Sequence, residues 1–435
     1  MPHPVLAPDT SLVRALGVRT LTASIVNATV GAGIFVLPAA VGALGPGAPV
    51  AYLVCAGAMA LVVTCFAMAG SRVALTGGLY AYVEVAFGRF AGFLCGVLLW
   101  LSCVLGASGI LSALAASLAV VVPVLGSGVA RAGLILLVVG ALAVVNVRGV
   151  RGAGRLVEWL TLVKLLPLLA FVAIGLFHVQ PDTRLLPALP DAGALGQTSL
   201  LLIFAFIGIE MALVPSGEVM EPARTVPRAI FLALGLTTAV YLAIQFVAYG
   251  MLGPELSRFT DAPLGEALRR VLGAPGQALM VAGAMVSMLG YASGDMLSSP
   301  RLLFAFGRDG LLPPRFAQVH VRYRTPHLAI GVYAVLVAAL ALIDSFGVLT
   351  LLSNIATLSL YLLCCAGAWE LDRRDVRSGG VPFRAPGGAA VPVLACGAIV
   401  WLLSHATWQE IAAEAAVLAL ASVFYFLRPA AWRSR

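Results

Sequence analysis

Apolar windows of about 20 residues follow one another along the whole chain. A helix needs about 20 residues to cross roughly 30 Å of bilayer hydrocarbon. The sequence is 61% hydrophobic and 11% charged, with a mean hydropathy of +1.02, which is more apolar than the core of a soluble domain requires. We therefore expect an all-α membrane protein. The windows lie at 17–41, 49–70, 89–121, 129–147, 157–178, 196–217, 229–252, 274–299, 326–344, 348–369, 390–405 and 409–427.

These windows predict twelve transmembrane helices. No polar low-complexity stretch separates them, so we expect residues 1–435 to form a single transmembrane domain. The first window is too long for the core of a signal peptide and is expected to be retained.

The arginines indicate the orientation of the chain. Basic residues concentrate in cytoplasmic loops, and most arginines here fall in the tails and loops on the N-terminal side of the membrane. The arginines expected on the other side are Arg131, Arg184, Arg258, Arg269 and Arg270. We therefore expect both termini in the cytoplasm. The Arg-rich, Lys-poor composition is typical of a GC-rich bacterial genome, which favours a multi-pass protein of the inner membrane.

Several function classes fit the sequence poorly. The net charge of +8 is spread over loops rather than gathered in one patch, so we expect no nucleic-acid partner. The seven cysteines all lie in apolar windows without zinc-ligand spacing, and the chain has no phosphate-cradling GxxxxGK[ST] loop. No Ser/His/Asp set is evident. We expect no metal ion, no cofactor and no enzymatic activity.

The stretch NATVGAGIFVLP, residues 27–38, places Gly31, Ala32 and Gly33 in the middle of the first window. Glycine weakens a helix interior by roughly 0.5–1 kcal/mol relative to alanine. Non-helical backbone at membrane depth is tolerated only where it is buried in protein or lines a polar cavity. The glycines therefore predict either a helix break beside a cavity or a close helix contact of the small-xxx-small type.

A second interruption lies five windows later, in FAFIGIEMALVPSGEV, residues 204–219. Gly208, Pro215 and Gly217 interrupt the sixth window, and Glu210 puts a carboxyl into it. The first and sixth windows occupy corresponding places if the first ten windows form two halves of five. Interrupted segments at matching places in two halves indicate the substrate site of a transporter.

Four motifs in order resemble the amino acid, polyamine and organocation transporter superfamily, and the resemblance covers nearly the whole chain. VGAGIFVLPA resembles its first span, and TGGLYAYVEVAFGRFAGFLCG, residues 76–96, resembles its loop between spans 2 and 3. FAFIGIE with GEVMEPARTVPRAI is similar to its sixth span and the following loop. SPRLLFAFGRDGLLPPRFAQVHVRYRTPHLAI, residues 299–330, is similar to its segment between spans 8 and 9.

The resemblance implies two inverted five-helix repeats, about 16–178 and about 196–370, with discontinuous helices 1 and 6. Two additional helices at about 390–428 would follow. It also implies alternating access around a site near the bilayer centre, for an amino acid or an amine. The expected function is thus that of a secondary active permease.

The chemistry of an amino acid suggests how such a site binds it. Unwound backbone at residues 30–34 offers N–H groups and a positive helix end to the carboxylate, and carbonyls at residues 204–207 could receive the ammonium. The family register adds residues of span 3 and makes Phe204 an aromatic lid, although ordinary helix packing would explain the same residues. The expected substrate-binding residues are Val30, Gly31, Ala32, Gly33, Ile34, Ser102, Cys103, Ala107, Phe204, Ala205, Phe206, Ile207 and Gly208. The small wall of Ala32, Ala107 and Ile207 suggests a neutral side chain of modest size.

Three ionisable residues inside windows are candidates for coupling and gating. Glu210 follows the break in the sixth window, and Asp295 lies in the eighth, where it either faces the pocket or is wetted by the cytoplasmic vestibule. Lys164 is the only lysine in the chain. Its ammonium could snorkel to the interface. The resemblance instead places it where sodium-coupled members of the fold bind their ion.

A positive charge at Lys164 would take the place of sodium. Because this ammonium could also gain and lose a proton as the site opens to either side, we expect protons as a partner and proton-coupled uptake. Sodium-independent exchange of amino acids or amines is the alternative. A channel or a membrane sensor fits less well, because no ring of like charges, filter sequence or soluble output domain is visible. The oligomeric state stays open.

Overall fold

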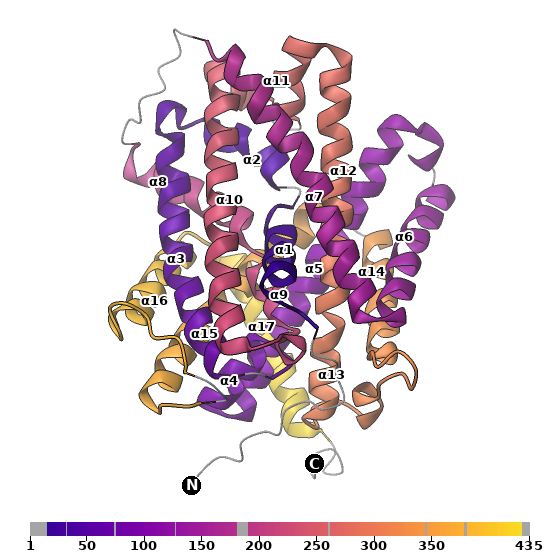
Figure 1. The fold of residues 1–435 in the computed structure, drawn as a ribbon, viewed down its shortest axis with the longest axis vertical. Helices are drawn as coiled ribbons and strands as arrows, with labels where there is room; N and C mark the ends of the chain where they lie inside the picture. The colour runs from indigo at the N-terminus through magenta and orange to yellow at the C-terminus, as the bar shows by residue number, and fades with distance from the viewer. Residues whose placement is uncertain are drawn as a thin grey trace.

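The computed structural model describes residues 15–31, 33–73, 75–126, 128–180, 190–259, 262–343, 346–377 and 381–428. In this part of the chain the regular structure is helical, apart from one isolated parallel bridge between Leu16 and Val219. The expected all-α class is confirmed (Figure 1).

The first half of the chain contains seven α-helices among its described residues. Those that lie on the first five apolar windows are long, except where the first window is divided in two. The helices are α1 (Val18–Thr29), α2 (Gly33–Gly42), α3 (Ala48–Arg72), α4 (Leu79–Phe87), α5 (Arg89–Val121), α6 (Gly128–Arg148) and α7 (Val150–Gly175).

The described second half begins with a divided segment and continues with longer helices. These helices are α8 (Ala192–Leu202), α9 (Ile209–Leu213), α10 (Pro222–Leu252), α11 (Pro263–Leu272), α12 (Ala274–Ser298), α13 (Pro300–Arg308), α14 (His327–Ile343), α15 (Phe346–Arg373), α16 (Ala390–Leu403) and α17 (Trp408–Leu427).

Local sequence signals explain several helix ends. The Asp191 carboxylate caps α8 by accepting the N–H groups of Gly193 and Ala194 at 2.9 and 3.2 Å. Pro222 and Pro263 begin α10 and α11, where proline loses no intrahelical hydrogen bond. α10 is followed by a glycine with positive φ, Gly253 at +57°, which ends the helix at little steric cost.

Membrane-crossing helices are present, as expected. By length and hydropathy, six helices in the described ranges could cross a bilayer, and the bent pair α1 and α2 would make a seventh. Three shorter apolar helices, at His327–Ile343, Ala390–Leu403 and Ile411–Leu427, accompany them. The protein is therefore a multi-pass membrane protein.

Helix α1 lies in the middle of the molecule (Figure 1). It contacts α7, α9, α10 and α12. Around it, α3 packs against α10, α7 against α12, and α5 against α15. The break between α1 and α2 is thus enclosed by other helices rather than facing lipid.

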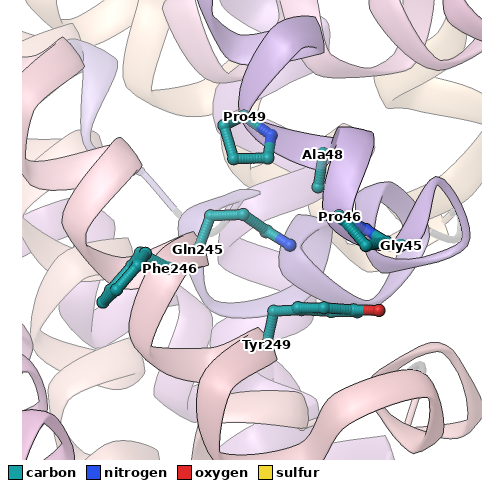
Figure 2. Close-up of a pocket in the computed structure, with 7 residues that line it drawn as sticks. All are labelled: Gly45, Pro46, Ala48, Pro49, Gln245, Phe246 and Tyr249. Carbon is teal, nitrogen blue, oxygen red and sulfur yellow. The ribbon is translucent and has the colours of Figure 1, made fainter. Parts of the chain in front are cut away.

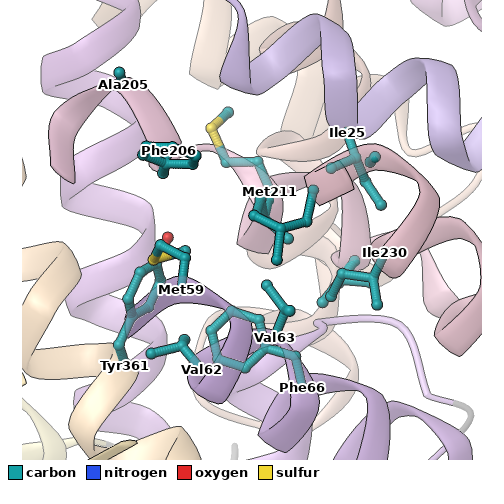
Figure 3. Close-up of a cluster of buried hydrophobic side chains, with 14 of the residues drawn as sticks. Ile25, Met59, Val62, Val63, Phe66, Ala205, Phe206, Met211, Ile230 and Tyr361 are labelled. Carbon is teal, nitrogen blue, oxygen red and sulfur yellow. The ribbon is translucent and has the colours of Figure 1, made fainter. Parts of the chain in front are cut away.

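Figure 3 shows part of a cluster of buried apolar side chains at which several helices meet. It joins Ile25 of α1, Phe66 of α3, Met211 of α9 and Ile230 of α10, all of them buried. The ring of Tyr361 from α15 packs edge-on against Phe66, with 5.1 Å between the ring centroids. This cluster fixes the position of Tyr361, whose hydroxyl belongs to the site described below.

A buried ion pair connects the segment after α9 to the start of α13. Arg301 Nε lies 2.5 Å from Glu218 Oε1 and Arg301 Nη2 lies 3.2 Å from Oε2, and both side chains are 1% exposed. The Glu218 carbonyl also accepts the N–H groups of Ala15 and Leu16, at 2.9 and 3.0 Å. The approach to α1, the segment after α9 and α13 are therefore tied together at one point.

Removing one partner of this pair should destabilise the protein strongly. Glu218→Ala leaves the Arg301 guanidinium buried without its carboxylate, which costs about 3–5 kcal/mol. Thermal unfolding of the purified protein in detergent should show a clearly lower melting temperature for Glu218→Ala. The double variant Glu218→Ala/Arg301→Met should recover most of the lost stability. Arg377→Gln removes an exposed partner of Asp375 and should change stability by less than about 1 kcal/mol. Equal stability of Glu218→Ala and wild type would contradict the expectation.

A second polar cluster joins α4 to the end of α13. The Tyr80 hydroxyl donates to Asp309 Oδ2 at 2.7 Å, and Arg308 Nε lies 2.7 Å from Asp309 Oδ1. Glu84 lies on the same helix as Tyr80, with Arg89 Nε 3.9 Å from its carboxylate. Burial, together with the charge of Asp309, raises the pKa of Glu84 to about 7.

Stability should therefore depend on pH through Glu84. Its carboxyl binds a proton more tightly in the folded protein than it does at its ordinary pKa of 4.5. The free energy of unfolding therefore falls by roughly 3 kcal/mol as pH rises from about 4.5 to about 7. Melting temperatures between pH 5 and 8 should fall less steeply for Glu84→Gln than for wild type. Glu221→Gln, which changes an exposed carboxyl, should keep the wild-type slope. Parallel slopes for wild type and Glu84→Gln would show that Glu84 titrates normally.

Candidate functional site

The first apolar window is broken where the glycines predict. α1 ends at Thr29 and α2 begins at Gly33, and the two axes are bent by 51°. The N–H of Val30 bonds the Val26 carbonyl at 2.8 Å, and the N–H of Gly31 bonds the Thr29 carbonyl at 2.9 Å. Ala32 lies outside the described residues.

The hydrogen bonds at this break leave fewer backbone N–H groups available to bind a ligand. The N–H groups of Val30 and Gly31 are used within the chain itself, although the sequence suggested them as anion donors. Gly33 and Ile34 begin α2, and N–H groups in the first turn of a helix have no intrahelical partner. A carboxylate would therefore find its donors at the start of α2.

The carbonyls freed by the break are paired by side chains of α7 and α12. Lys164 Nζ donates to the carbonyls of Asn27 and Val30, each at 2.5 Å. The Ser287 hydroxyl lies 2.9 Å from the Val30 carbonyl and 3.0 Å from that of Gly31. A freed carbonyl without such a donor would cost several kcal/mol in hydrocarbon.

Lys164 is completely buried, so its ammonium does not snorkel to the interface. Among the described residues no carboxylate forms an ion pair with it. Asn27 also donates through Nδ2 to the Gly290 carbonyl of α12, at 2.5 Å. A Cβ at Gly290 would lie 2.6 Å from Asn27 Oδ1 and 3.6 Å from Lys164 Cδ. The lysine therefore occupies a narrow space between α1, α7 and α12.

The sixth window is broken as well. α8 ends at Leu202, one 3₁₀ turn follows, and Gly208, with φ +117°, precedes the short helix α9. A Cβ at Gly208 would lie 2.8 Å from the backbone carbon and oxygen of Ala28. The two breaks thus touch each other, main chain against main chain.

Tyr241 of α10 connects the two breaks. Its hydroxyl lies 2.9 Å from the Thr29 carbonyl and 2.8 Å from the Ala205 carbonyl, and its ring packs edge-on against Phe206. A hydroxyl has one proton, so it can donate to only one of these carbonyls at a time. The Ala205 carbonyl is therefore partly occupied, whereas the sequence suggested that it was free.

Glu210 holds the turn at Gly208. Its carboxylate oxygens accept the N–H of Gly208 at 3.1 and 3.0 Å, and the hydroxyl of Tyr361 donates to Oε2. The side chain is 1% exposed. Glu210 therefore links the break in the sixth window to α15.

The remaining predicted side chains are distributed around these breaks. Ser102, Cys103 and Ala107 are buried on α5, and Ser102 Oγ donates within its own helix to the Leu99 carbonyl at 3.0 Å. Ala205 and Phe206 are buried and Ile207 is partly buried. The side chain of Phe204 lies outside the described part, so its role as a lid stays a prediction.

Asp295 is 1% exposed and is not wetted by a vestibule. Its carboxylate accepts the Ser299 hydroxyl at 2.7 Å and the Tyr333 hydroxyl at 2.5 Å. Its partners thus lie on α14 and at the junction of α12 and α13. Its place in coupling stays a prediction.

Sequence reasoning missed Tyr291, which lies between the two breaks and α5. Its hydroxyl is 3.6 Å from Met211 Sδ of α9, and a Cβ at Gly106 of α5 would lie 3.0 Å from that hydroxyl. A Cβ at Gly31 would lie 3.8 Å from its ring. Tyr291 and Ser287 are four residues apart and so share one face of α12, a spacing that could have flagged them together.

A small pocket lies between the turn before α3 and α10 (Figure 2). Its volume is about 10 Å³, enough for at most one water. The hydroxyl of Tyr52 donates to Gln245 Oε1 at 3.4 Å, and Gln245 Nε2 is buried without a hydrogen-bond partner in the described structure. The pocket is a place for a water molecule and is too small for an amino acid.

Comparison with known proteins agrees with this geometry. A model of the amino acid permease family matches residues 16–427. The methylthioribose transporter of Bacillus subtilis (strain 168) is 27% identical, over 96% of this chain and 94% of its own. The branched-chain amino acid permease of that organism is 27% identical, with the same coverage, and its serine/threonine exchanger is 27% identical over 86% of this chain and 88% of its own. An uncharacterised transporter of Mycobacterium tuberculosis is 33% identical, over 97% of this chain and 92% of its own.

Two broken helices that meet inside a helical membrane protein are the architecture of a membrane transporter. The family match covers nearly the whole chain. The chain belongs to the amino acid permease family, whose members are transporters and not enzymes.

Two glycines in the breaks should respond differently to alanine. Gly208 combines φ +117° with backbone 2.8 Å from the added Cβ, so Gly208→Ala should lose at least about 2 kcal/mol of stability. At Gly31 the nearest atoms to an added Cβ lie 3.8 Å away and φ is not in the left-handed region. Gly31→Ala should therefore elute and melt like wild type in detergent. Equal melting temperatures for the two variants would contradict the geometry at Gly208.

Proposed function

We propose that this protein is a secondary active permease that carries amino acids across a bacterial inner membrane by alternating access, with uptake coupled to protons. The observation that carries the proposal is the backbone contact between the two broken helices at Ala28 and Gly208. Helix breaks are costly in a bilayer and are kept where they line a binding site.

The proposed architecture has twelve spans. Two inverted five-helix repeats, about 16–178 and about 196–370, precede two additional helices at about 390–428 within one transmembrane domain, residues 1–435. Both termini lie in the cytoplasm, as the arginine distribution predicts.

In the proposed site the substrate carboxylate binds the N–H groups at the start of α2. The helix dipole adds a favourable term for an anion at that end. The substrate ammonium binds carbonyls of residues 204–207, and the side chain faces Ser102, Cys103 and Ala107 on α5. Small residues there favour a neutral side chain of modest size, and Phe204 closes the site as a lid.

Lys164 is proposed to carry the coupling proton. The ammonium donates to the Asn27 and Val30 carbonyls, so loss of its proton would weaken two charge-assisted hydrogen bonds at the end of α1. Protonation and the geometry of the break are therefore linked. Glu210 would transmit the state of the sixth-window break to α15 through Tyr361, and Asp295 would act at α14 through Tyr333.

Sodium-independent exchange is the second candidate for the transport mode. A serine/threonine exchanger is among the relatives, and a fixed charge at Lys164 serves an exchanger as well as a symporter. A channel or a sensor is less consistent with two broken helices that contact each other.

A ligand screen tests the substrate class. A neutral amino acid that binds the folded protein should raise the melting temperature as its concentration increases. At one hundred times the Kd it should add about 2.7 kcal/mol to the free energy of unfolding. The screen should contain the twenty amino acids, common amines and methylthioribose, because one relative is a methylthioribose transporter. A response confined to amines or to methylthioribose would overturn the proposal that the substrate is a neutral amino acid. Counterflow of the responding ligand in proteoliposomes, lost in Gly33→Val, would support the site, and efflux without trans-stimulation would indicate a channel.

Replacing Lys164 should separate coupling from transport. In proteoliposomes we expect wild-type uptake to ignore sodium and to accelerate at least several-fold with an inward proton gradient. Lys164→Gln keeps a hydrogen-bond donor near the Asn27 and Val30 carbonyls but removes the charge, so acceleration by protons should disappear while counterflow persists. Arg155→Gln changes an exposed arginine about two and a half turns away on the same helix. It is the control and should behave like wild type. Sodium-dependent accumulation by wild type would overturn the coupling proposal, and gradient-independent exchange in both proteins would favour the exchanger.

A further inference from the structure

A cavity of about 270 Å³ lies between α6 and α14, away from the broken helices. Its wall is apolar and includes Ala143 and Val147 of α6 and Ile330 of α14. Its polar lining residues, here called the mouth, are Arg148, Tyr323 and His327. The mouth lies where α6 ends and α14 begins, that is, at one end of the two helices.

The cavity opens on the lipid-facing side of the molecule. Of the described crossing helices, α6 is the least enclosed, with 17% of its apolar window buried. Leu137 on α6 is 70% exposed and Val335 on α14 is 68% exposed. In a bilayer, hydrocarbon covers these side chains, and the apolar wall of the cavity continues that surface.

The mouth of the cavity is held in place by the loop before α14. Thr325 Oγ1 donates to the Val147 carbonyl at 2.7 Å, which ties this loop to the last turn of α6. The His320 N–H donates to the Thr325 carbonyl at 2.8 Å, and the His320 ring lies 4.7 Å from Tyr323 and 5.6 Å from His327, between ring centroids. The loop that carries Tyr323 and leads to His327 is thus tied to the end of α6.

The charge at the mouth favours an anion. In the described structure Arg148 forms no ion pair with a carboxylate. Neither residues 128–157 nor residues 310–343 contain an Asp or a Glu, whereas both stretches contain several arginines. A guanidinium with free donors next to histidine and tyrosine suits a phosphate, which it can bind through two parallel hydrogen bonds.

We propose that this cavity binds an anionic phospholipid of the bilayer. The phosphate binds Arg148, with His327 and Tyr323 beside it, and the first part of an acyl chain lies along Ala143, Val147 and Ile330. Basic pockets between membrane helices on the cytoplasmic side are suited to anionic headgroups. A soluble phosphate would use the mouth but not the apolar wall, so the combination selects a lipid.

Phosphatidylglycerol in mixed micelles is the probe for this site. It should raise the melting temperature of the wild-type protein, and phosphatidylcholine at the same mole fraction should not. Arg148→Gln should raise at least tenfold the concentration of phosphatidylglycerol that gives the same increase in melting temperature. Arg151→Gln, which removes an exposed arginine of α7 outside the cavity, should respond like wild type.

A second variant and a second ligand distinguish a lipid site from a simple anion site. Ala143→Trp fills the apolar wall, leaves Arg148 in place, and should also lose the response. Glycerol phosphate, which has a phosphate but no acyl chains, should give no shift at the concentrations where the lipid does. Melting temperatures of each variant without lipid report its folding. An equal lipid response in wild type, Arg148→Gln and Ala143→Trp would overturn the proposal that this cavity is the binding site. An equal response to glycerol phosphate would overturn the proposal that the ligand is a lipid.

Discussion

Backbone carbonyls and N–H groups inside a bilayer have no water to bind, so they need hydrogen-bond partners within the protein. This constraint determines how the centre of this molecule is built. A break in α1 frees carbonyls at Asn27, Val30 and Gly31 that water cannot reach. Lys164 and Ser287 donate to them from α7 and α12. The broken helix is therefore stable only in the presence of these neighbouring helices, which explains why α1 lies in the middle of the molecule.

The same constraint joins the two breaks into one unit. The Gly208 backbone rests on Ala28, and the single proton of Tyr241 is shared between Thr29 and Ala205. Because Glu210 holds the Gly208 turn and accepts a hydrogen bond from Tyr361, a movement of either break changes the hydrogen bonds of α10 and α15. In the proposed transport cycle, these shared hydrogen bonds would let a bound substrate bias both breaks together, as alternating access requires.

The sequence predicted the helical class and the positions of both breaks, because glycine, proline and a lone carboxyl are visible exceptions within apolar windows. It also directed attention to Lys164, a lone lysine among apolar residues. Tyr241, Ser287 and Tyr291 were missed because a tyrosine or serine in a membrane helix is common, and its role depends on the element that packs against it. The use of the Val30 and Gly31 N–H groups within α1 could not be predicted either, since it depends on how the last turn of that helix closes.

The buried pair of Glu218 and Arg301 follows the same rule with charges in place of carbonyls. Two ions removed from water cost more than their attraction returns unless further hydrogen bonds assist them, and here the Leu297 carbonyl accepts from Arg301 while the Glu218 main chain binds Ala15 and Leu16. The pair joins the segment after one broken helix to the approach of the other. Because this one pair and its assisting hydrogen bonds hold three segments that lie far apart in the sequence, it keeps the approach to α1, the segment after α9 and the start of α13 in one arrangement.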